Sequence, residues 1–408
     1  MIEWSEQHLM IRDAFQRFVE EEIKPNQEEL EHGDLPPYEI LRKMYSTFGM
    51  DEMARTRFEK QIAAEKAGKS KSEAKRESRS GDGGGAAMML IPIIEMCRYC
   101  PGMVTAMGVS VGLTAGAIMS KGTIAQKEKW GLPVLTLEKI GAWAITEPGS
   151  GSDAFGGMKA TARRDGDGYI LNGNKTFITN GPYADTTVFI CKLEEEGVAP
   201  EDRKMVSFIL DKGMPGFEQT KPMRKMGMHS SPTGELFLQD VKVGRDRLIG
   251  ESEEQAQGRS GAKDTFSIER AGVASMALGI IEQCLEYCVA YAKERVSFGK
   301  PIGEYQLIQL KLAKMEVARM NVQNLIFRQI ELGESGKNMT FAEASAMKLY
   351  SAQVCTEVCL EAVQLFGGNG YMAEYKVEQL ARDAKVMQIY AGTDEMQIRA
   401  IARDLLTR

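Results

Sequence analysis

The sequence predicts an α+β protein in three parts, with helices at both ends of the chain and a β-rich segment between them. Apolar residues recur at helical spacing before about residue 140 and again after about residue 265. Between about 141 and 250, short β-rich runs alternate with glycine, proline and aspartate turns. We therefore expect an N-terminal α-helical domain (1–140), a central antiparallel β-barrel or sandwich (141–250) and a C-terminal helical bundle (251–408).

Length and composition are typical of a globular protein with more than one domain. A chain of 408 residues is too long for one ordinary core, and 43% hydrophobic with 26% charged residues fits a soluble protein. A net charge of −6 gives no reason to expect a nucleic-acid partner. The chain does not open with a charged segment and a short apolar run, so we expect no secretory signal and a cytoplasmic location.

Residues 101–120 carry no charge and are about long enough to span a membrane. They contain four glycines, serine and threonine but no aromatic anchors, so a helix buried in a large protein explains them equally well. We expect no membrane span.

The seven cysteines, an odd number, are typical of a reducing compartment. Most of them lie in apolar helical patterns, where cysteine behaves as a small hydrophobic residue. The three histidines are isolated from one another. We therefore expect neither a metal site nor a histidine-based catalytic triad.

The N-terminal part should be helical apart from one charged excursion. Apolar stripes in 5–24 and 38–48 predict two helices. Residues 51–85 mix lysine and arginine with glutamate, offer few apolar anchors and end in a glycine-rich run. A solvated helix or a mobile excursion is the simpler interpretation, and a partner-binding arm is the alternative. From 86 to about 140 the pattern is helical again.

The middle part contains four runs typical of strands, at 169–171, 186–191, 205–210 and 235–243. In the C-terminal part, long helical patterns cover 266–295, 305–333 and 341–366, and a final pair of helices follows residue 372. Glycine-containing breaks at 298–301 and 367–370 separate the long helices.

The stretch 142–181 carries the most distinctive polar pattern. It opens with Ala-Trp-Ala-Ile-Thr-Glu-Pro-Gly-Ser-Gly-Ser-Asp and closes with Asn-Gly-Asn-Lys-Thr-Phe-Ile-Thr-Asn-Gly. Small apolar residues running into glycine and serine predict a strand that ends in a loop whose backbone another group approaches closely. Clustered amides and hydroxyls can hold anionic oxygens or the edge of a polar ring. An ordinary tight turn is the alternative.

Several segments together resemble the acyl-CoA dehydrogenase family of flavoproteins. In chain order they are Ala-Ile-Thr-Glu-Pro-Gly-Ser-Gly-Ser-Asp (144–153), Lys-Thr-Phe-Ile-Thr-Asn-Gly (175–181), Arg-Val-Ser-Phe-Gly-Lys (295–300), Gln-Leu-Phe-Gly-Gly-Asn-Gly-Tyr (364–371), Arg-Asp-Ala-Lys (382–385) and Ile-Tyr-Ala-Gly-Thr (389–393). Each is weak alone, but their order and separations match from about residue 104 to the C-terminus. The resemblance implies an FAD held between the β domain and the C-terminal bundle, in a homotetramer built from dimers.

The resemblance also implies which residues meet the FAD. The positions expected at the flavin itself are Ile145, Thr146, Gly151 and Ser152, with Phe177 and Thr179 beside its ring. Those expected on the pyrophosphate and adenosine of a neighbouring subunit's FAD are Arg295, Ser297, Phe298 and Gln306, joined by Gln364 and Gly368. Thr393 and Glu395 are expected at the FAD of their own subunit. Many members carry tryptophan where this chain has Phe177, which keeps an aromatic wall but lacks an N–H donor.

The reaction that the resemblance implies is α,β-dehydrogenation of an acyl-CoA thioester to a trans-2-enoyl-CoA. A carboxylate removes the α-proton while the β-hydrogen passes as hydride to flavin N5, and electrons then pass to an electron-transferring flavoprotein. That base must be a desolvated glutamate that is still ionised near neutral pH. Most members carry it in a Tyr-Glu-Gly-Thr segment, but this chain has alanine at position 391.

Isovaleryl-CoA and long-chain acyl-CoA dehydrogenases resemble this chain in lacking that glutamate, and they place the base on the first long helix of the bundle. This chain has Ser-Ile-Glu-Arg-Ala at the matching place, 267–271, so we expect Glu269 to be the base. A favourable position in the first turn of a helix, or a surface ion pair with Arg270, is the alternative for Glu269. Asp394 and Glu395 are the nearest rivals for the role.

The thioester carbonyl must be polarised, and in the family a backbone N–H and a ribityl hydroxyl of FAD do this. The backbone N–H survives loss of a side chain, so Ala391 can still donate. The motif positions place the substrate against Ser152, Arg270, Tyr390 and Gly392. Two other hypotheses stay open: a related flavin monooxygenase or oxidase, which needs no such base, and a scaffold that keeps the fold without the cofactor.

Overall fold

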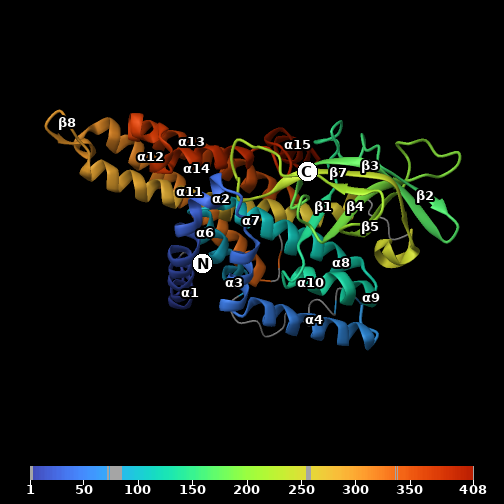
Figure 1. The fold of residues 1–408 in the computed structure, drawn as a ribbon. Coiled ribbons are helices and arrows are strands. Elements are labelled where there is room, and N and C mark those ends of the chain that lie inside the picture. Colours follow the sequence, from blue (N-terminus) through green and yellow to red (C-terminus); the bar gives the residue numbers. More distant parts are fainter. Residues whose placement is uncertain are drawn as a thin grey trace.

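The structure is a computed structural model that describes residues 3–70, 73, 85–253, 259–335, 337 and 339–407; of residues 85, 86, 259–269 and 271 it describes the backbone alone. The strands lie at one end of the molecule, the long C-terminal helices extend to the other end, and several N-terminal helices lie below the sheet (Figure 1). The chain runs through N-terminal helices, then a sheet, then long C-terminal helices, so the three-part α–β–α order is confirmed. The predicted domain boundaries near 140 and 250 stay a prediction.

The N-terminal part is helical, as the apolar stripes predicted. The first helix is extended by a π-helical turn to Ile23 and begins at a capping box between Ser5 and His8. The helices are α1 (Glu6–Phe18), α2 (Gln27–His32), α3 (Tyr38–Thr47), α4 (Met50–Lys66), α6 (Gly85–Cys97), α7 (Pro101–Met107), α8 (Gly116–Lys121), α9 (Ile124–Gln126) and α10 (Leu132–Leu135).

The first half of the charged excursion is the helix α4. Its inner face buries Phe58 and Ile62, and Glu65 accepts hydrogen bonds from the fully buried ammonium of Lys127 at 2.6 Å to each oxygen. This part of the excursion is therefore packed on one face and solvated on the other. Residues 71–72 and 74–84 lie outside the described residues, so the nature of the second half stays a prediction.

The strands form one seven-stranded sheet in the order β1-β4-β2-β3-β7-β6, with β5 on the other edge of β4. Their bounds are β1 (Gly141–Ala144), β2 (Thr161–Asp165), β3 (Gly168–Thr179), β4 (Thr186–Leu193), β5 (Met205–Asp211), β6 (Phe217–Gln219) and β7 (Thr233–Val243). The four runs predicted from the sequence correspond to β3, β4, β5 and β7.

The expectation of a purely antiparallel sheet needs correction, because β4 pairs in parallel with both β1 and β2. The remaining pairings are antiparallel. A sequence pattern shows that a segment is extended but not in which direction its neighbour runs. Every residue of β4 is buried, which fits a strand in the middle of the β core.

The C-terminal helices have nearly the predicted bounds. They are α11 (Arg259–Glu294), α12 (Gln306–Glu334), α13 (Phe341–Phe366), α14 (Val377–Val386) and α15 (Asp394–Thr407), and a small hairpin of β8 (Val296–Ser297) and β9 (Lys300–Pro301) joins α11 to α12. The hairpin and the glycine-rich turn after α13 lie where the breaks were predicted.

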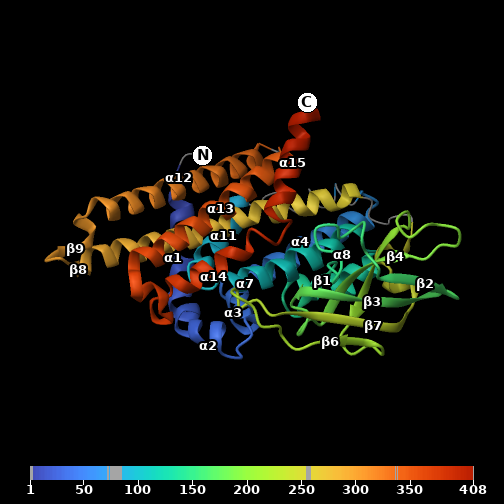
Figure 2. The ribbon, with the colours of Figure 1, turned by 90° about the horizontal axis from the view of Figure 1, so that it is seen from above.

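Helices from both ends of the chain share one hydrophobic core. Its buried side chains include Phe15 and Met103 from the N-terminal part and Ile281, Val322 and Leu365 from the bundle. The strands enclose a second core, to which Ile118 and Trp130 contribute. In Figures 1 and 2 the N-terminal helices α6 and α7 accordingly lie against α11, and α6 also packs on α12.

Two helical stretches of the described chain, Pro101–Lys121 and Gly272–Glu294, are long and apolar enough to cross a membrane. In each, more than half of the most apolar window is buried inside the protein, 56% and 67% respectively. A place in the core explains their composition, and the absence of a membrane span stays an expectation. All seven cysteines are buried and unpaired, and burial raises the pKa of Cys97 and Cys100, which suits small apolar packing groups.

A buried pair of carboxyl groups joins α2 to α14. Glu31 is only 4% exposed and Asp383 is fully buried, and Asp383 accepts hydrogen bonds from the backbone N–H of Met228 and from Gln379. Burial, followed by the charge of Asp383, raises the pKa of Glu31 from 4.5 to about 8. Burial also lowers the pKa of the nearby Lys225 to about 8, and His229 Nδ1 lies 3.7 Å from Glu31 Oε2.

Replacing Glu31 by glutamine should make stability less dependent on pH. The folded protein binds the Glu31 proton more tightly than the unfolded chain, so stability is fully present below about pH 4.5 and falls as the pH rises towards about 8. Glu31→Gln keeps the neutral form, so we expect its Tm at about pH 8 to exceed that of the parent by about 5 °C. Thermal unfolding at several pH values measures this. The exposed Glu21 gives a matched control, since Glu21→Gln should follow the parent at every pH.

Candidate functional site

A buried ion pair stabilises the loop that follows β1. The ammonium of Lys175 is fully buried and donates to the carboxylate of Glu147 at 2.9 Å and to the carbonyl of Ile145 at 3.0 Å. The Glu147 carboxylate also accepts the backbone N–H groups of Lys159 (2.7 Å) and Ala160 (3.0 Å). Glu147 therefore ties together both ends of the 145–160 segment, and Lys175 connects it to β3.

The outer side of this loop presents the residues predicted to meet a flavin. The N–H of Thr176 donates to the carbonyl of Thr146 at 2.9 Å, which aligns the loop with β3. Phe177 projects outward with 66% of its surface exposed and a left-handed φ of 57°. Of the predicted flavin-contact residues on this loop and on β3, Ile145, Thr146 and Thr179 are half-buried, and Gly151, Ser152 and Phe177 are exposed.

A second group of predicted residues meets where α11, α13 and the 390–393 loop converge. The buried Arg270 donates through Nη1 to Ser345 Oγ at 2.7 Å, and its guanidinium lies 4.1 Å from the ring centre of Phe341. A Cβ atom at Gly392 would lie 3.4 Å from Arg270 Nη2. Glu269 directly precedes Arg270 on α11, but its side chain lies outside the described part of the structure, so its role stays a prediction.

The 390–393 loop has an unusual backbone. Ala391 has a left-handed φ of 54°, which is uncommon for a residue other than glycine, and Gly392 has a φ of 87°. No residue with a described side chain or carbonyl accepts a hydrogen bond from the Ala391 N–H, so that donor is available to a ligand. The Tyr390 hydroxyl, in contrast, points back to Met276 Sδ, 3.4 Å away.

Two residues that sequence reasoning missed hold this loop. The fully buried ammonium of Lys348 donates to the carbonyl of Gly392 at 2.9 Å. The buried Gln397 donates to the carbonyls of Ala391 (3.1 Å) and Gly392 (2.7 Å). The sequence did offer one signal. Lys348 stands in the largely apolar helical pattern of 341–366, and a lysine that such a helix buries needs a polar partner.

The two rivals for the base are engaged elsewhere. Asp394 accepts from Lys348 at 3.4 Å and from Gln353 at 3.1 Å. Glu395 is exposed, and a backbone hydrogen bond at the start of α15, followed by the Thr393 hydroxyl, lowers the pKa of its carboxyl. A lowered pKa makes Glu395 a weaker proton acceptor.

The third group of predicted residues surrounds the β8–β9 hairpin. Phe298 at its tip is 95% exposed, with a left-handed φ of 49°. Tyr291 near the end of α11 stacks on Phe366 and accepts a hydrogen bond from Asn369 at 3.0 Å, which ties the glycine-rich turn to the part of α11 that precedes the hairpin. The predicted residues here are all at least partly exposed: Arg295, Ser297, Phe298, Gln306, Gln364 and Gly368.

A single chain does not bring this third group to the other two. In both Figure 1 and Figure 2 the β8–β9 hairpin lies at one extremity of the molecule, whereas the sheet lies at the other and α15 lies between them. This separation agrees with the expected role of the hairpin towards a neighbouring subunit, which stays a prediction.

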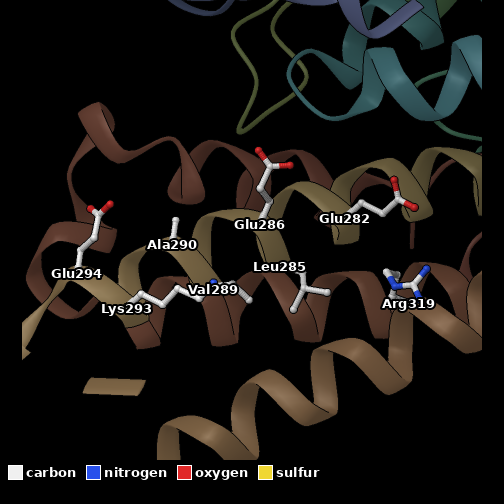
Figure 3. Close-up of a pocket in the computed structure, with 8 residues that line it drawn as sticks. All are labelled: Glu282, Leu285, Glu286, Val289, Ala290, Lys293, Glu294 and Arg319. Carbon is white, nitrogen blue, oxygen red and sulfur yellow. The ribbon is translucent and has the colours of Figure 1, made fainter. Parts of the chain in front are cut away.

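A groove of about 560 Å³ between α11 and α12 is a different feature (Figure 3). It is lined by Glu282, Leu285, Glu286, Val289, Ala290, Lys293, Glu294 and Arg319, and none of the predicted site residues is among them. Arg12 bridges Glu282 to Glu95 at one end of it. The groove therefore belongs to a charged network between helices.

Removing the cation beneath the first loop should be costly. Lys175→Met leaves the Glu147 carboxylate buried without its cation, and loss of one partner of a buried pair costs about 3–5 kcal/mol. We expect Glu147→Gln in the same chain to restore part of this stability, because the uncompensated charge is then gone. Denaturant unfolding of the two single variants and the double variant measures the coupling. Additive losses would contradict a direct ion pair.

The comparisons with known proteins agree with the motifs. The family model for the middle domain of acyl-CoA dehydrogenases matches residues 142–241, and the model for their C-terminal domain matches residues 256–406. The short-chain-specific acyl-CoA dehydrogenase of Megasphaera elsdenii is 38% identical over 82% of this chain and 85% of its own length.

Two further relatives cover nearly the whole chain. The CarC subunit of the caffeyl-CoA reductase–Etf complex of Acetobacterium woodii is 36% identical over 99% of this chain and 100% of its own. The solved structure of butyryl-CoA dehydrogenase from Megasphaera elsdenii superposes with a TM-score of 0.84 at 33% identity, covering 100% of both chains.

Proposed function

This chain belongs to the acyl-CoA dehydrogenase family, a family of flavin-dependent enzymes, and we propose that it uses FAD to oxidise an acyl-CoA thioester to a trans-2-enoyl-CoA. The observation that carries this proposal is the convergence of Arg270, Ser345 and the 390–393 loop, with the Ala391 N–H left available. Fold alone would not support an activity. A buried guanidinium beside an unused backbone donor supports binding of a thioester whose oxygen gains negative charge.

The described residues fit an FAD in their chemistry. A flavin needs an aromatic wall and hydrogen-bond donors along its ring edge, and Phe177 on β3 with Thr146 and Ser152 on the loop after β1 offer these. A Cβ atom at Gly149 or Gly151 would meet nothing within 4 Å, so that backbone is open to approach. The exposed Arg295 supplies a planar guanidinium suited to a pyrophosphate.

The chemistry follows from what these groups can hold and move. Bound FAD would accept the β-hydrogen together with its electron pair. Glu269, in its ionised form, would take the α-proton, so that the Cα–Cβ bond becomes a double bond. The Ala391 N–H would donate to the thioester oxygen while negative charge develops there. Arg270 would hold its place through Ser345 and Phe341 and offer a positive environment to that charge.

A short acyl chain is the substrate class that the relatives favour. One relative is named short-chain specific and the matching solved structure is a butyryl-CoA dehydrogenase. The CarC subunit, which belongs to a reductase–Etf complex, supports a second candidate, reduction of an enoyl-CoA by the same site run in reverse. In either direction we propose that electrons are exchanged with an electron-transferring flavoprotein, and that the protein works in the cytoplasm.

We also propose a homotetramer in which each hairpin completes the FAD site of a neighbour. The hairpin carries Phe298 and Val296, both well exposed, at the far end of the molecule. Apolar side chains continue along the outer face of α12, where Leu307, Leu310 and Val317 are each more than half exposed. Surfaces of this kind support association with another protein surface.

Removing the base should abolish reduction of the flavin without removing the flavin. In anaerobic titration with butyryl-CoA and longer saturated acyl-CoAs, we expect the parent's flavin absorbance to bleach, fastest with the short chains. Glu269→Gln should keep FAD and acyl-CoA affinity but bleach at least about 1000-fold more slowly. Glu286→Gln, on the exposed face of the same helix, is the control and should match the parent. Bleaching of Glu269→Gln at the parent rate would rule out this base.

Mixed assemblies test whether the hairpin acts on a neighbour. Glu269→Gln and Arg295→Ala should each be inactive alone, the second through loss of FAD. If the hairpin serves the neighbouring subunit, a mixed dimer contains one site with both an intact base and an intact hairpin. We therefore expect co-expressed chains to recover activity, measured per bound FAD. If the hairpin serves its own subunit, no intact site forms and no activity returns.

A further inference from the structure

Lys348 is a buried cation with no role in the reaction as proposed so far. It lies on α13 with its side chain fully buried, and its ammonium faces the carbonyl of Gly392 at 2.9 Å and Asp394 Oδ1 at 3.4 Å. A buried lysine is expensive unless its charge is paired and its protons are used. Both of these partners lie in the segment that runs from the 390–393 loop into α15. Lys348 therefore connects that segment to α13.

Gln397 on α15 donates hydrogen bonds to the same loop. Its Nε2 lies 2.7 Å from the Gly392 carbonyl that Lys348 also contacts, and 3.1 Å from the Ala391 carbonyl. Two successive peptide planes are therefore fixed by their oxygens. Since a trans peptide places its N–H opposite its carbonyl, these contacts also direct the N–H groups of Gly392 and Thr393 away from α13 and α15.

The hydrogen bonds from Lys348 and Gln397 explain how the backbone of Ala391 keeps its conformation. A left-handed φ of 54° is strained for alanine, and such strain persists only where the surroundings over-determine it. The hydrogen bonds fix the two peptide planes that follow Ala391. If φ of Ala391 became negative while these planes stayed in place, its N–H would point in a new direction. The direction of that donor therefore depends on Lys348 and Gln397 together.

We propose that Lys348 is a positioning residue that fixes the direction of the Ala391 N–H towards the thioester oxygen. This rests on the proposed function, because the donor matters only if a thioester binds there. The proposal goes further than the proposed function, because it assigns the alignment of the Ala391 N–H to Lys348, a residue outside the site. Lys348 acts through the Gly392 carbonyl, which it shares as an acceptor with Gln397.

The first test separates catalysis from binding. We expect Lys348→Met to lower kcat by about 10- to 100-fold, in line with loss of one preorganised donor, while KM for butyryl-CoA changes by less than about threefold. Lys348→Arg keeps a cation and should recover part of kcat. If Lys348→Met lowers kcat less than about twofold, or if KM carries the whole loss, the proposal is wrong.

The second test measures the donor without turnover. Acetoacetyl-CoA ionises to an enolate with charge on its thioester oxygen, and the enolate's ultraviolet absorbance reports its apparent pKa when bound. Lys348→Met should raise that apparent pKa by about one unit, because a misaligned N–H stabilises the anion less. An unchanged apparent pKa would overturn the proposal. The mutant cycle with Gln397→Met should be non-additive, since the two side chains share one acceptor.

The control removes an equally buried lysine elsewhere. Lys127 is fully buried and paired with Glu65 on α4, which is not a predicted site residue. Lys127→Met should lose stability but keep the parent's kcat and the apparent pKa of bound acetoacetyl-CoA. If Lys127→Met reproduces the effects of Lys348→Met, the losses are general consequences of a buried charge change and the proposal falls.

Hydrogen exchange in flavin-free protein distinguishes this proposal from the proposed function. Lys348→Met should speed exchange of the amides in 388–394 by about tenfold relative to the parent and to Lys127→Met. If no acyl-CoA bleaches the parent's flavin, the proposed function fails, yet faster exchange would still support the role of Lys348 in holding the loop. If Lys348→Met does not fold, Lys348→Arg and Asp394→Asn are measured in the same assays, and parent values in both would overturn the proposal.

Discussion

Lys175 lies fully buried under the loop that follows β1, and its ammonium reaches both the Glu147 carboxylate and the Ile145 carbonyl. Burial lowers the pKa of this lysine, and the charge of Glu147 opposes that shift. The loop has little apolar anchoring of its own, since Pro148, Gly149 and Gly151 are exposed. Its shape therefore depends on this ion pair and on the backbone N–H groups that Glu147 accepts. Lys348 does the same for the 390–393 loop, so a buried ammonium supports each of the two loops on which the proposed chemistry depends.

Much of the fold could be predicted because helical periodicity and glycine breaks are local. The helix α13 has the predicted bounds of 341–366, and the hairpin after α11 lies at the predicted break. Strand direction could not be predicted, and β2 escaped notice because Thr-Ala-Arg-Arg-Asp has neither the apolar alternation nor the β-branched content of a strand. The core shared between helices at opposite ends of the chain is also invisible locally, because it gathers residues such as Phe15 and Ile281 that are far apart in sequence.

For the site, sequence motifs identified residues but not their supports. Arg270 and Gly392 could be named from their motif positions, and the structure brings them together. Lys348 and Gln397 could not be named, because their importance lies in which carbonyls they reach across the bundle. The hairpin group was named from its motif, and the β8–β9 hairpin lies at one extremity of the molecule, away from the sheet; its role towards a neighbouring subunit stays a prediction.

The position of the base can change within such a scaffold because the two functions of the 390–393 loop are separable. At position 391 a carboxylate base would come from the side chain, whereas the N–H donor belongs to the backbone. Alanine therefore keeps the donor although it lacks the carboxylate. Lys348 and Gln397 bind carbonyl oxygens of the loop, so these hydrogen bonds do not depend on which side chain stands at 391. Arg270 approaches the same loop from α11, and the carboxylate of the residue directly before it, Glu269, is proposed to serve the same thioester. The bundle thus holds the N–H donor whichever element supplies the carboxylate base, which is the arrangement proposed for Ala391 together with Glu269.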